Sequence, residues 1–322
     1  MYVLELGGED DDFAACEAAS AAEGIEPLAS GLALARAVDA ERLRTLAYTL
    51  RASEVVGQGA ASVESARAIL EAAPLDREGT VAVRARDVRR TAGIDTQRAE
   101  RQLGAVLTDH GYAIDLDDPD HELRALFADD SCTLGWFAVE SRRGFGARAP
   151  TEKPFFQPGS MSPLLARALA NIAGARPGAT VVDPMCGTGG ILVEAGLVGA
   201  RVLGFDAQSK MARGAATNLA HYLDGRATFT TAQADATSLP LADGVADAVV
   251  FDAPYGRQSK IEGDLRAVVT GALAEANRVA SGTVVVGDRP WTDAARAAGW
   301  TVETTFERRV HRSLTRHVAV LS

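Results

Sequence analysis

Residues 180–190 read Thr180-Val181-Val182-Asp183-Pro184-Met185-Cys186-Gly187-Thr188-Gly189-Gly190, and an apolar helical pattern follows at once over residues 191–195. A short apolar run therefore ends in an acid and passes through a glycine-rich turn into a helix. Glycines at such a turn let the backbone approach a ligand closely, and the helix N-terminus offers it free N–H groups. The stretch predicts the first strand-to-helix unit of an α/β domain that binds a nucleotide-containing cofactor.

The turn departs from the fingerprint of dinucleotide-binding folds. After Gly187 and Gly189 that fingerprint requires Gly or Ala where this chain has Leu192, and here the acid Asp183 precedes the turn. NAD is therefore disfavoured as the cofactor. A Gly-x-Gly pair alone is weak support for any ligand, because a tight turn needs glycine even where nothing binds.

Alternation of strands and helices continues towards the C-terminus. Continuous apolar runs suit strands that are covered on both faces, so we expect a mostly parallel sheet. In such a sheet the ligand lies at the carboxyl ends of the strands. The runs expected to form strands are 180–182, 202–205, 227–231, 248–251 and 283–286.

Acidic residues stand where three of these strands end. Asp206 follows the second strand, 23 residues after Asp183, and Asp235 follows the third. One acid in such a place is unremarkable, since aspartate also caps helices and fills turns. Three of them beside a glycine turn favour a nucleoside site, in which carboxylates accept hydrogen bonds from ribose hydroxyls and an adenine amine.

The fourth strand ends in Asp252-Ala253-Pro254-Tyr255. The carboxylate can accept hydrogen bonds from an exocyclic amine while the tyrosine ring stacks on a flat base. Pro254 stiffens the turn and adds no N–H donor near the amine. Alone, the motif would be an ordinary strand-end turn with a partly buried tyrosine. Beside the glycine turn, it indicates a site that acts on a base.

The first half of the chain predicts an α+β module, and a stretch rich in Gly and Pro between Ser141 and Pro163 indicates a linker. We expect an N-terminal segment over 1–54, a second module over 55–141, a linker over 142–154 and the α/β domain over 155–322. The further strands expected are 2–6, 55–57, 81–86, 113–116, 122–127 and 134–140, and the helices are 12–22, 62–73, 95–110 and 162–173.

Charge is distributed unevenly along the 322 residues. The chain has 33 Lys and Arg against 43 Asp and Glu, a net charge of -10, and only three of its basic residues are lysine. Residues 1–150 hold 27 acidic and 16 basic groups, so the surplus of acid lies in the N-terminal half. Surplus carboxylates are typical of proteins that work in concentrated salt, whereas GC-rich coding explains only the scarcity of lysine. Such a net charge argues against nucleic-acid partners unless basic residues cluster locally.

The cysteines and the hydropathy pattern are those of a cytoplasmic protein. Cys16, Cys132 and Cys186 are far apart and no C-x-x-C or paired histidine spacing accompanies them, so we expect a reducing compartment and no metal. There is no signal-peptide pattern and no run of about 18 apolar residues. We therefore expect no membrane contact. We also expect a monomer, although the sequence itself does not define the oligomeric state.

Three stretches resemble one enzyme family. They are R-A-P-T-E-K-P-F-F-Q-P-G-S-M over 148–161, D-P-M-C-G-T-G-G-I over 183–191 and R-V-H-R-S-L-T-R over 309–316, and they are similar to the archaeal tRNA (guanosine-10 N2)-methyltransferases. That family joins a ferredoxin-like segment and a THUMP RNA-binding domain to a Rossmann-like class I methyltransferase domain. Residues 81–104 and 114–120 are similar to the THUMP pattern. Family members have proline where this chain has Ala253, although the acid, Pro254 and the aromatic remain.

The resemblance implies S-adenosylmethionine as cofactor, with no metal, and tRNA as partner. The cofactor-binding residues it implies are Phe156, Asp183, Gly187, Gly189, Asp206 and Asp235, and the catalytic residues are Asp252, Pro254 and Tyr255. For RNA binding we expect three basic clusters to act, and their strongest members are Arg84, Arg86, Arg89, Arg90, Arg143, Arg309 and Arg312. Arg142, Arg148, Lys153, Arg308 and Arg316 belong to the same clusters. Solvated faces that balance the carboxylates are an equally plausible interpretation of any one cluster.

The reaction that the resemblance implies is methyl transfer to the N2 amine of a guanosine in tRNA, at position 10. The sequence does not decide between one methyl group and two. Alternatives are a guanine elsewhere in tRNA or rRNA, adenine N6, and a non-catalytic RNA-binding module. The four strand-end acids disfavour the last alternative, because all of them are in place.

Overall fold

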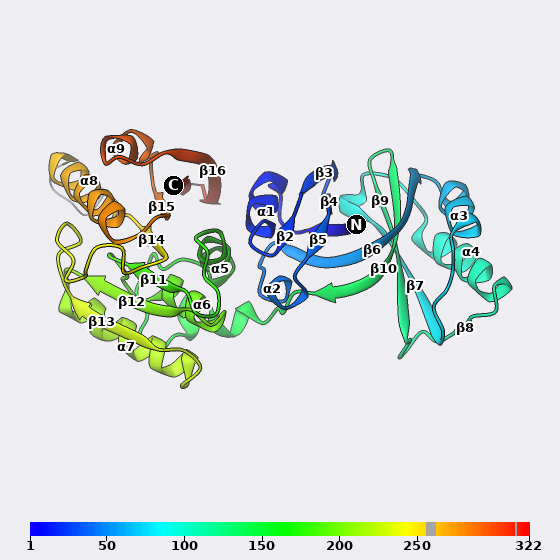
Figure 1. The fold of residues 1–322 in the computed structure, drawn as a ribbon, viewed down its shortest axis with the longest axis horizontal. Coiled ribbons are helices and arrows are strands. Elements are labelled where there is room, and N and C mark those ends of the chain that lie inside the picture. The colour runs from blue at the N-terminus through cyan, green and yellow to red at the C-terminus, as the bar shows by residue number, and fades with distance from the viewer. Residues whose placement is uncertain (256–261, 313) are drawn as a thin grey trace. The chain divides into compact units, whose positions relative to one another are not determined.

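The computed structural model describes residues 1–255, 262–312 and 314–322, which form two compact units, Met1–Arg142 and Arg143–Ser322. Figure 1 shows the course of the chain through both. The N-terminal unit contains the strands β1 (Tyr2–Leu6), β2 (Ala22–Glu23), β3 (Glu26–Ala29), β4 (Leu32–Ala35), β5 (Ala37–Val38), β6 (Thr49–Ala60), β7 (Thr80–Asp87), β8 (Ala113–Ile114), β9 (His121–Ala128) and β10 (Ser131–Glu140). Its helices are α1 (Asp11–Ala18), α2 (Ala40–Leu43), α3 (Val63–Ala72) and α4 (Thr96–Asp109).

One eight-stranded sheet organises the N-terminal unit, in the order β3-β4-β1-β6-β10-β9-β7-β8. Paired strands are antiparallel, except that β7 runs parallel to both β8 and β9. Helices α3 and α4 lie side by side and pack on β6 and β7 (Figure 1). Their apolar faces and the strands share a core that includes Leu70, Leu103, Leu107 and Phe127. The α+β architecture expected for this half is confirmed.

Strand β6 begins at Thr49, well before the expected start at residue 55, and so runs across the expected boundary between residues 54 and 55. Charged side chains within the strand hid it from the apolar pattern. Arg51 pairs with Glu140 of β10 at 3.1 Å, and Glu54 pairs with Arg77 at 2.6 Å. The short strands β2 to β5 and helix α2 were also not expected.

The C-terminal unit contains a seven-stranded sheet in the order β13-β12-β11-β14-β15-β17-β16. Its strands are β11 (Thr180–Asp183), β12 (Arg201–Asp206), β13 (Phe229–Gln233), β14 (Ala248–Asp252), β15 (Thr283–Gly287), β16 (Val302–His311) and β17 (Leu314–Leu321). Its helices are α5 (Pro163–Ile172), α6 (Gly190–Leu197), α7 (Ser209–Leu223), α8 (Glu262–Val279) and α9 (Thr292–Ala297).

The five strands β11 to β15 are parallel, which confirms the expected α/β sheet. Figure 1 shows α8 and α9 on one side of the sheet and α7 on the other. Strand β17 is antiparallel to both β15 and β16, so the sheet ends in a hairpin. The hairpin was not expected, because charged residues interrupt the apolar pattern of β16, in which exposed and partly buried residues alternate. That pattern suits an edge strand, since outward charges discourage pairing with another chain.

In the part of the chain that the structure describes, no helix is long and apolar enough to cross a membrane.

Candidate active site

The carboxyl ends of β12, β11 and β14 lie next to one another, because these strands are adjacent and parallel. Two cavities are found there. A cavity of about 770 Å³ is bordered by Asp206, Asp235 and Asp252. A smaller one of about 180 Å³ is bordered by Asp183, Gly187 and Asp252. The fold thus brings the four expected acids to one edge of the sheet, and Asp252 borders both cavities.

Asp183 is buried at the end of β11, with 2 % of its surface exposed. Its carboxylate accepts a hydrogen bond from the backbone N–H of Met185 at 3.0 Å. Burial raises the pKa of Asp183 well above its usual value, and the nearby carboxylates of Asp206 and Asp252 raise it further. A buried carboxylate is unfavourable without a cationic partner, and no ion pair of Asp183 is found among the residues that the structure describes. This wall of the smaller cavity therefore suits a cationic ligand group.

The glycine turn connects β11 to α6 and is tied to β12. The N–H of Gly187 donates to Asp206 at 3.0 Å, and φ of Gly187 is +53°, in the left-handed region. Gly189, at φ +74°, is the N-cap of α6, and a side-chain carbon there would lie 3.1 Å from Cβ of Ala215 in α7. Gly187 borders the smaller cavity, whereas Gly189 packs against a helix. The left-handed backbone and the close packing on α7 thus account for glycine at residue 189 without any ligand.

Asp235 follows β13 and borders the larger cavity. Its carboxylate accepts hydrogen bonds from the backbone N–H and the hydroxyl of Thr237, at 2.9 and 2.8 Å, and these bonds lower the pKa of Asp235. Asp206 accepts from the N–H of Gln208 at 2.8 Å in addition to that of Gly187. The two acids are thus held in fixed positions by their own turns.

Phe156 was expected at the cofactor, but it is 43 % exposed and is not among the described residues that border either cavity. Its neighbour Phe155 is the anchored residue. The Phe155 N–H donates to Oδ1 of Asn218 at 2.9 Å, and the Asn218 amide donates to the carbonyls of Phe155 and Thr188. The ring of Phe155 lies where a side chain at Gly214 would be. The sequence analysis did not identify Asn218 as the residue that fixes this loop. The signal in the sequence is a single amide side chain within an alanine-rich helix.

The Asp252–Tyr255 motif at the end of β14 is contacted by Arg316 from β17. The Tyr255 hydroxyl lies 2.8 and 2.9 Å from the two Asp252 oxygens, and Nε of Arg316 donates to that hydroxyl at 2.8 Å. A terminal nitrogen of Arg316 is 3.4 Å from Oδ2 of Asp252. Arg316 was expected to contact RNA, and this was wrong, because its side chain is only 4 % exposed. Pro254 borders the larger cavity.

Opposing effects act on the pKa of Asp252. Burial and the nearby Asp288 raise the pKa of Asp252, while Arg316 and the Tyr255 hydroxyl oppose this increase, and the net pKa lies above its usual value. Burial and the Asp252 carboxylate raise the pKa of Tyr255, so the phenol stays protonated and can donate. Asp252 is therefore an acceptor whose ionisation depends on its neighbours.

Three of the arginines expected to bind RNA in the N-terminal unit have partners within the protein. Arg84 donates to the Leu116 carbonyl at 2.6 Å, and Arg86 pairs with the buried Glu5 at 2.9 Å. Arg89 pairs with Asp11. Arg90 is exposed, and both it and Arg89 have positive φ, at 59° and 54°.

The basic residues of the expected linker and of the hairpin divide in the same way. Arg148 forms a two-pronged ion pair with the buried Glu194, and Lys153 is 6 % exposed. Contrary to expectation, neither side chain is available to RNA. The guanidinium of Arg143 lies 5.0 Å from the centre of the Phe145 ring, and Arg143 is exposed. Arg309 and Arg312 are exposed near the tip of the β16–β17 hairpin.

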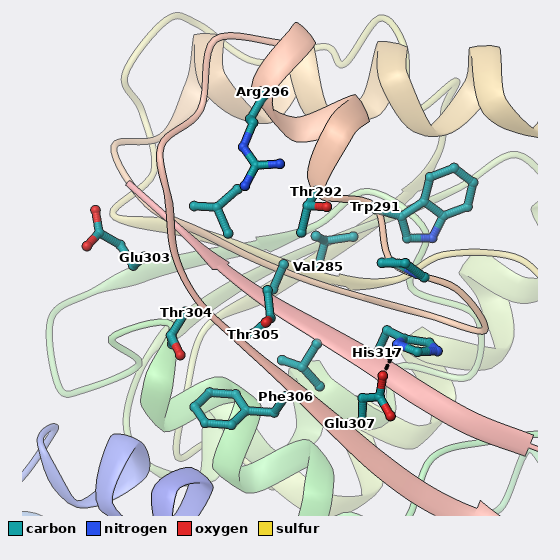
Figure 2. Close-up of a pocket in the computed structure, with 14 residues that line it drawn as sticks. Val285, Trp291, Thr292, Arg296, Glu303, Thr304, Thr305, Phe306, Glu307 and His317 are labelled. Carbon is teal, nitrogen blue, oxygen red and sulfur yellow. Dashed lines mark ion pairs between the residues drawn. The ribbon is translucent and has the colours of Figure 1, made fainter.

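A third cavity, of about 460 Å³, lies between α9, β16 and β17 (Figure 2). Figure 2 shows Arg296 reaching towards it from α9 and Trp291 at its side, and His317 is 3.5 Å from Glu307. None of the four strand-end acids borders this cavity. It is therefore separate from the candidate active site.

Cys186 lies in the glycine turn and is buried. Burial, with Asp183 and Asp206 nearby, raises the pKa of its thiol, so the nucleophilic thiolate is disfavoured. Among the described residues, no group of three or more His, Cys, Asp or Glu side chains could hold a metal ion.

Comparison with known proteins identifies the family. The family model described as RMKL-like, methyltransferase domain matches residues 150–318. A tRNA (guanine(10)-N2)-dimethyltransferase of Methanothermobacter thermautotrophicus is 34 % identical over 98 % of this chain and 93 % of that protein. The chain belongs to the tRNA (guanine(10)-N2)-dimethyltransferase family.

A second relative agrees with membership of this family, and two solved structures are similar in fold. A protein of the same name from Pyrococcus abyssi is 30 % identical over 76 % of this chain and 74 % of its own length. TrmN from Thermus thermophilus, at 23 % identity and a TM-score of 0.50, covers 100 % of this chain and 99 % of its own. SMU.472, solved in complex with SAH, has a TM-score of 0.52 at 14 % identity and covers 99 % of this chain and 97 % of its own. These two structures share the fold of this chain. The chain, as a member of this family, is a methyltransferase.

Proposed function

We propose that the chain transfers methyl groups from S-adenosylmethionine to the N2 amine of guanosine 10 in tRNA, first to N2-methylguanosine and then to N2,N2-dimethylguanosine. The observation that carries the proposal is the Asp252 carboxylate, which borders both cavities at the carboxyl end of the sheet. The relatives from Methanothermobacter thermautotrophicus and Pyrococcus abyssi are named for dimethylation at this atom and position.

The strand-end residues fit the cofactor. S-adenosylmethionine supplies, when bound, a methyl group on a positively charged sulfur. We assign Asp183 to the ammonium group, because a cation beside this buried carboxylate would relieve the unfavourable burial of its charge. Asp206 and Asp235 border the larger cavity, and we assign them to the ribose hydroxyls and the adenine amine.

Asp252 acts on the acceptor base. Its carboxylate accepts a hydrogen bond from the N2 amine, which raises the electron density on N2, and it receives a proton as the N–C bond forms. A carbonyl oxygen of Ala253 or Pro254 accepts a hydrogen bond from the other N–H of the amine. The enzyme's main task is to align the amine with the methyl group, an effect of up to about 7 to 11 kcal/mol. The base must leave its helix to reach the site, at a cost of a few kcal/mol.

Other acceptors remain as alternatives. They are a guanine N2 elsewhere in tRNA or in rRNA, and adenine N6, and a non-catalytic RNA-binding role is a third class. A relative in Mus musculus, 30 % identical over 55 % of this chain and 32 % of its own length, is named U6 snRNA (guanine-N(2))-methyltransferase THUMPD2. That name specifies the same acceptor atom, guanine N2, in a different RNA.

The test is incubation of the purified protein with labelled S-adenosylmethionine and an unmodified tRNA transcript, followed by digestion and mass spectrometry of the nucleosides. We expect N2-methylguanosine early and N2,N2-dimethylguanosine later. Label in N6-methyladenosine, or no label in any nucleoside, would contradict the proposal.

We further propose that the hairpin tip contacts tRNA beside the active site. Arg309 lies opposite Thr315, one residue from Arg316, and both it and Arg312 are exposed. The Arg309→Glu/Arg312→Glu variant is expected to bind tRNA at least about tenfold more weakly in a gel-shift assay, because it replaces two phosphate-binding groups with charges that repel phosphate. Arg296→Glu, which reverses an exposed arginine of α9, is the matched control and should bind normally. Undiminished affinity of the double variant would refute this contact.

We also propose that the chain works as a cytoplasmic monomer without membrane contact, with a ferredoxin-like segment over 1–54, a THUMP domain over 55–141, a linker over 142–154 and a methyltransferase domain over 155–322. All three cysteines are free thiols, which suits a reducing compartment.

Arg90 offers the cleanest test of RNA binding by the N-terminal unit. Reversing Arg84, Arg86 or Arg89 would break contacts within the unit itself. Arg90→Glu is expected to lower tRNA affinity several-fold in the same assay, because it loses one phosphate contact. Arg67→Glu on α3 is the control. Equal binding by Arg90→Glu and wild-type protein would remove Arg90 from the RNA-binding surface.

A further inference from the structure

Arg316 is a buried cation beside the proposed catalytic carboxylate, and the reaction described above does not use it. The residue lies in β17 and its side chain is 4 % exposed. Its Nε is 2.8 Å from the Tyr255 hydroxyl, and a terminal nitrogen is 3.4 Å both from Oδ2 of Asp252 and from the carbonyl oxygen of Gly159. One side chain therefore joins the end of β14, its turn and the loop at the smaller cavity.

We propose that Arg316 is a positioning residue for methyl transfer, which orients the Tyr255 hydroxyl towards Asp252 and keeps Asp252 in the ionised form that accepts the amine. The inference rests on the proposed function, because it concerns the acceptor side of that reaction.

The hydrogen-bond chemistry fixes the direction of this network. A guanidinium has only donors, so the Tyr255 hydroxyl must accept from Arg316. Its single proton is then directed at Asp252, whose oxygens lie 2.8 and 2.9 Å away. A carboxylate has about four lone-pair sites, so Asp252 can hold the hydroxyl and still accept a hydrogen bond from an amine. Arg316 thus sets the orientation of two of the three proposed catalytic residues.

The strand arrangement explains why residue 316 reaches this site. His317 pairs with Gly287 at the carboxyl end of β15, so Arg316 lies just beyond that end, near the carboxyl end of β14. Successive side chains of a strand point to opposite faces. His317 borders the third cavity, whereas Arg316 reaches Asp252.

The charged groups around Asp252 come from several elements. Asp183 faces it from the end of β11, and Asp288, which follows β15, also faces it. Among the described residues that act on Asp252, Arg316 is the cation that opposes these carboxylates. Loss of Arg316 should therefore raise the pKa of Asp252 further. Since the ionised form is the acceptor, the acid limb of the pH profile must then move to higher pH.

The test is the pH dependence of kcat with tRNA and saturating S-adenosylmethionine for wild-type protein, Arg316→Met and Arg316→Lys. For Arg316→Met we expect kcat at pH 7 to fall at least about tenfold and the acid midpoint to rise by about 1 to 3 pH units. Arg316→Lys keeps the positive charge but lacks the planar set of N–H donors with which a guanidinium holds two acceptors at once. It should keep the wild-type midpoint within about half a unit and have an intermediate kcat.

Arg167→Met is the matched control. Arg167 is also buried and pairs with Glu194 at 2.8 Å, and neither of these residues borders the cavities at Asp252. It should lower the melting temperature and leave the midpoint unchanged. An unmoved midpoint in Arg316→Met, with or without a loss of kcat, overturns the proposal. If Arg316→Met does not fold, Tyr255→Phe removes the intervening hydroxyl and should move the midpoint in the same direction, and an unmoved midpoint there also overturns it. Failure of the wild-type protein to methylate guanosine would instead reject the proposed function.

Discussion

Asp252→Asn is expected to lower kcat for tRNA methylation about 1000-fold, within the range of 10²- to 10⁴-fold for loss of a proton-accepting group. Asparagine has nearly the same size, but it is neutral and presents an N–H₂ group where the second oxygen lies. The network around it also suffers, since the buried Arg316 loses its anionic partner. Single-turnover kinetics with saturating cofactor measure the effect without interference from product release.

Two measurements separate this loss from misfolding. Asp243→Asn makes the same chemical change at a carboxylate that is 83 % exposed and pairs with Arg278, and it should leave kcat unchanged. The melting temperature of Asp252→Asn should fall, because the buried Arg316 loses its anionic partner, but it should stay above the assay temperature, so that the variant is folded when kcat is measured. Activity of Asp252→Asn within tenfold of wild type would exclude Asp252 as the acceptor.

Asp183→Asn is expected to weaken S-adenosylmethionine binding about 100-fold, because removal of one partner of a buried charge pair costs roughly 2 to 5 kcal/mol. The amide oxygen can still accept from the N–H of Met185, so the turn keeps its hydrogen bond. Isothermal titration calorimetry measures the change. Binding within threefold of wild type would contradict the assignment of Asp183 to the ammonium group.

The same variant should not destabilise the ligand-free protein. Burial raises the pKa of Asp183 in the folded state, so its ionisation opposes folding increasingly as pH rises from the unfolded pKa towards the folded one. Asparagine removes this effect. Without cofactor, the free energy of unfolding of Asp183→Asn at pH 8 should equal or exceed that of wild type, and the difference should disappear near pH 4, the unfolded pKa. A less stable variant at pH 8 would refute this.

The cofactor side of the site could be predicted from the sequence because it is local. A parallel strand, a glycine turn and an acid at the strand end form one continuous motif, and adjacent parallel strands bring such ends together. Asp183, Asp206, Asp235 and Asp252 accordingly lie at one edge of the sheet. Two adjacent phenylalanines look alike in sequence, and the packing of Phe155 on Gly214 distinguishes them, whereas the cofactor role of Phe156 stays a prediction.

The long-range contacts of the site could not be predicted in this way. Arg316 lies 61 residues from Tyr255, in the second strand of the β16–β17 hairpin, and in sequence it looks like one more member of an arginine cluster. Arg148 was misread for the same reason, since its partner Glu194 is 46 residues away. Whether an arginine contacts solvent or a buried carboxylate depends on strand order, which the apolar pattern does not encode.

The central claim is that the acceptor is the N2 amine of guanosine 10. A pair of tRNA transcripts that differ only at position 10, with guanosine in one and inosine in the other, tests it most directly, because inosine lacks only that amine. We predict methyl incorporation into the guanosine transcript and none into the inosine transcript. Equal incorporation into both would contradict the claim.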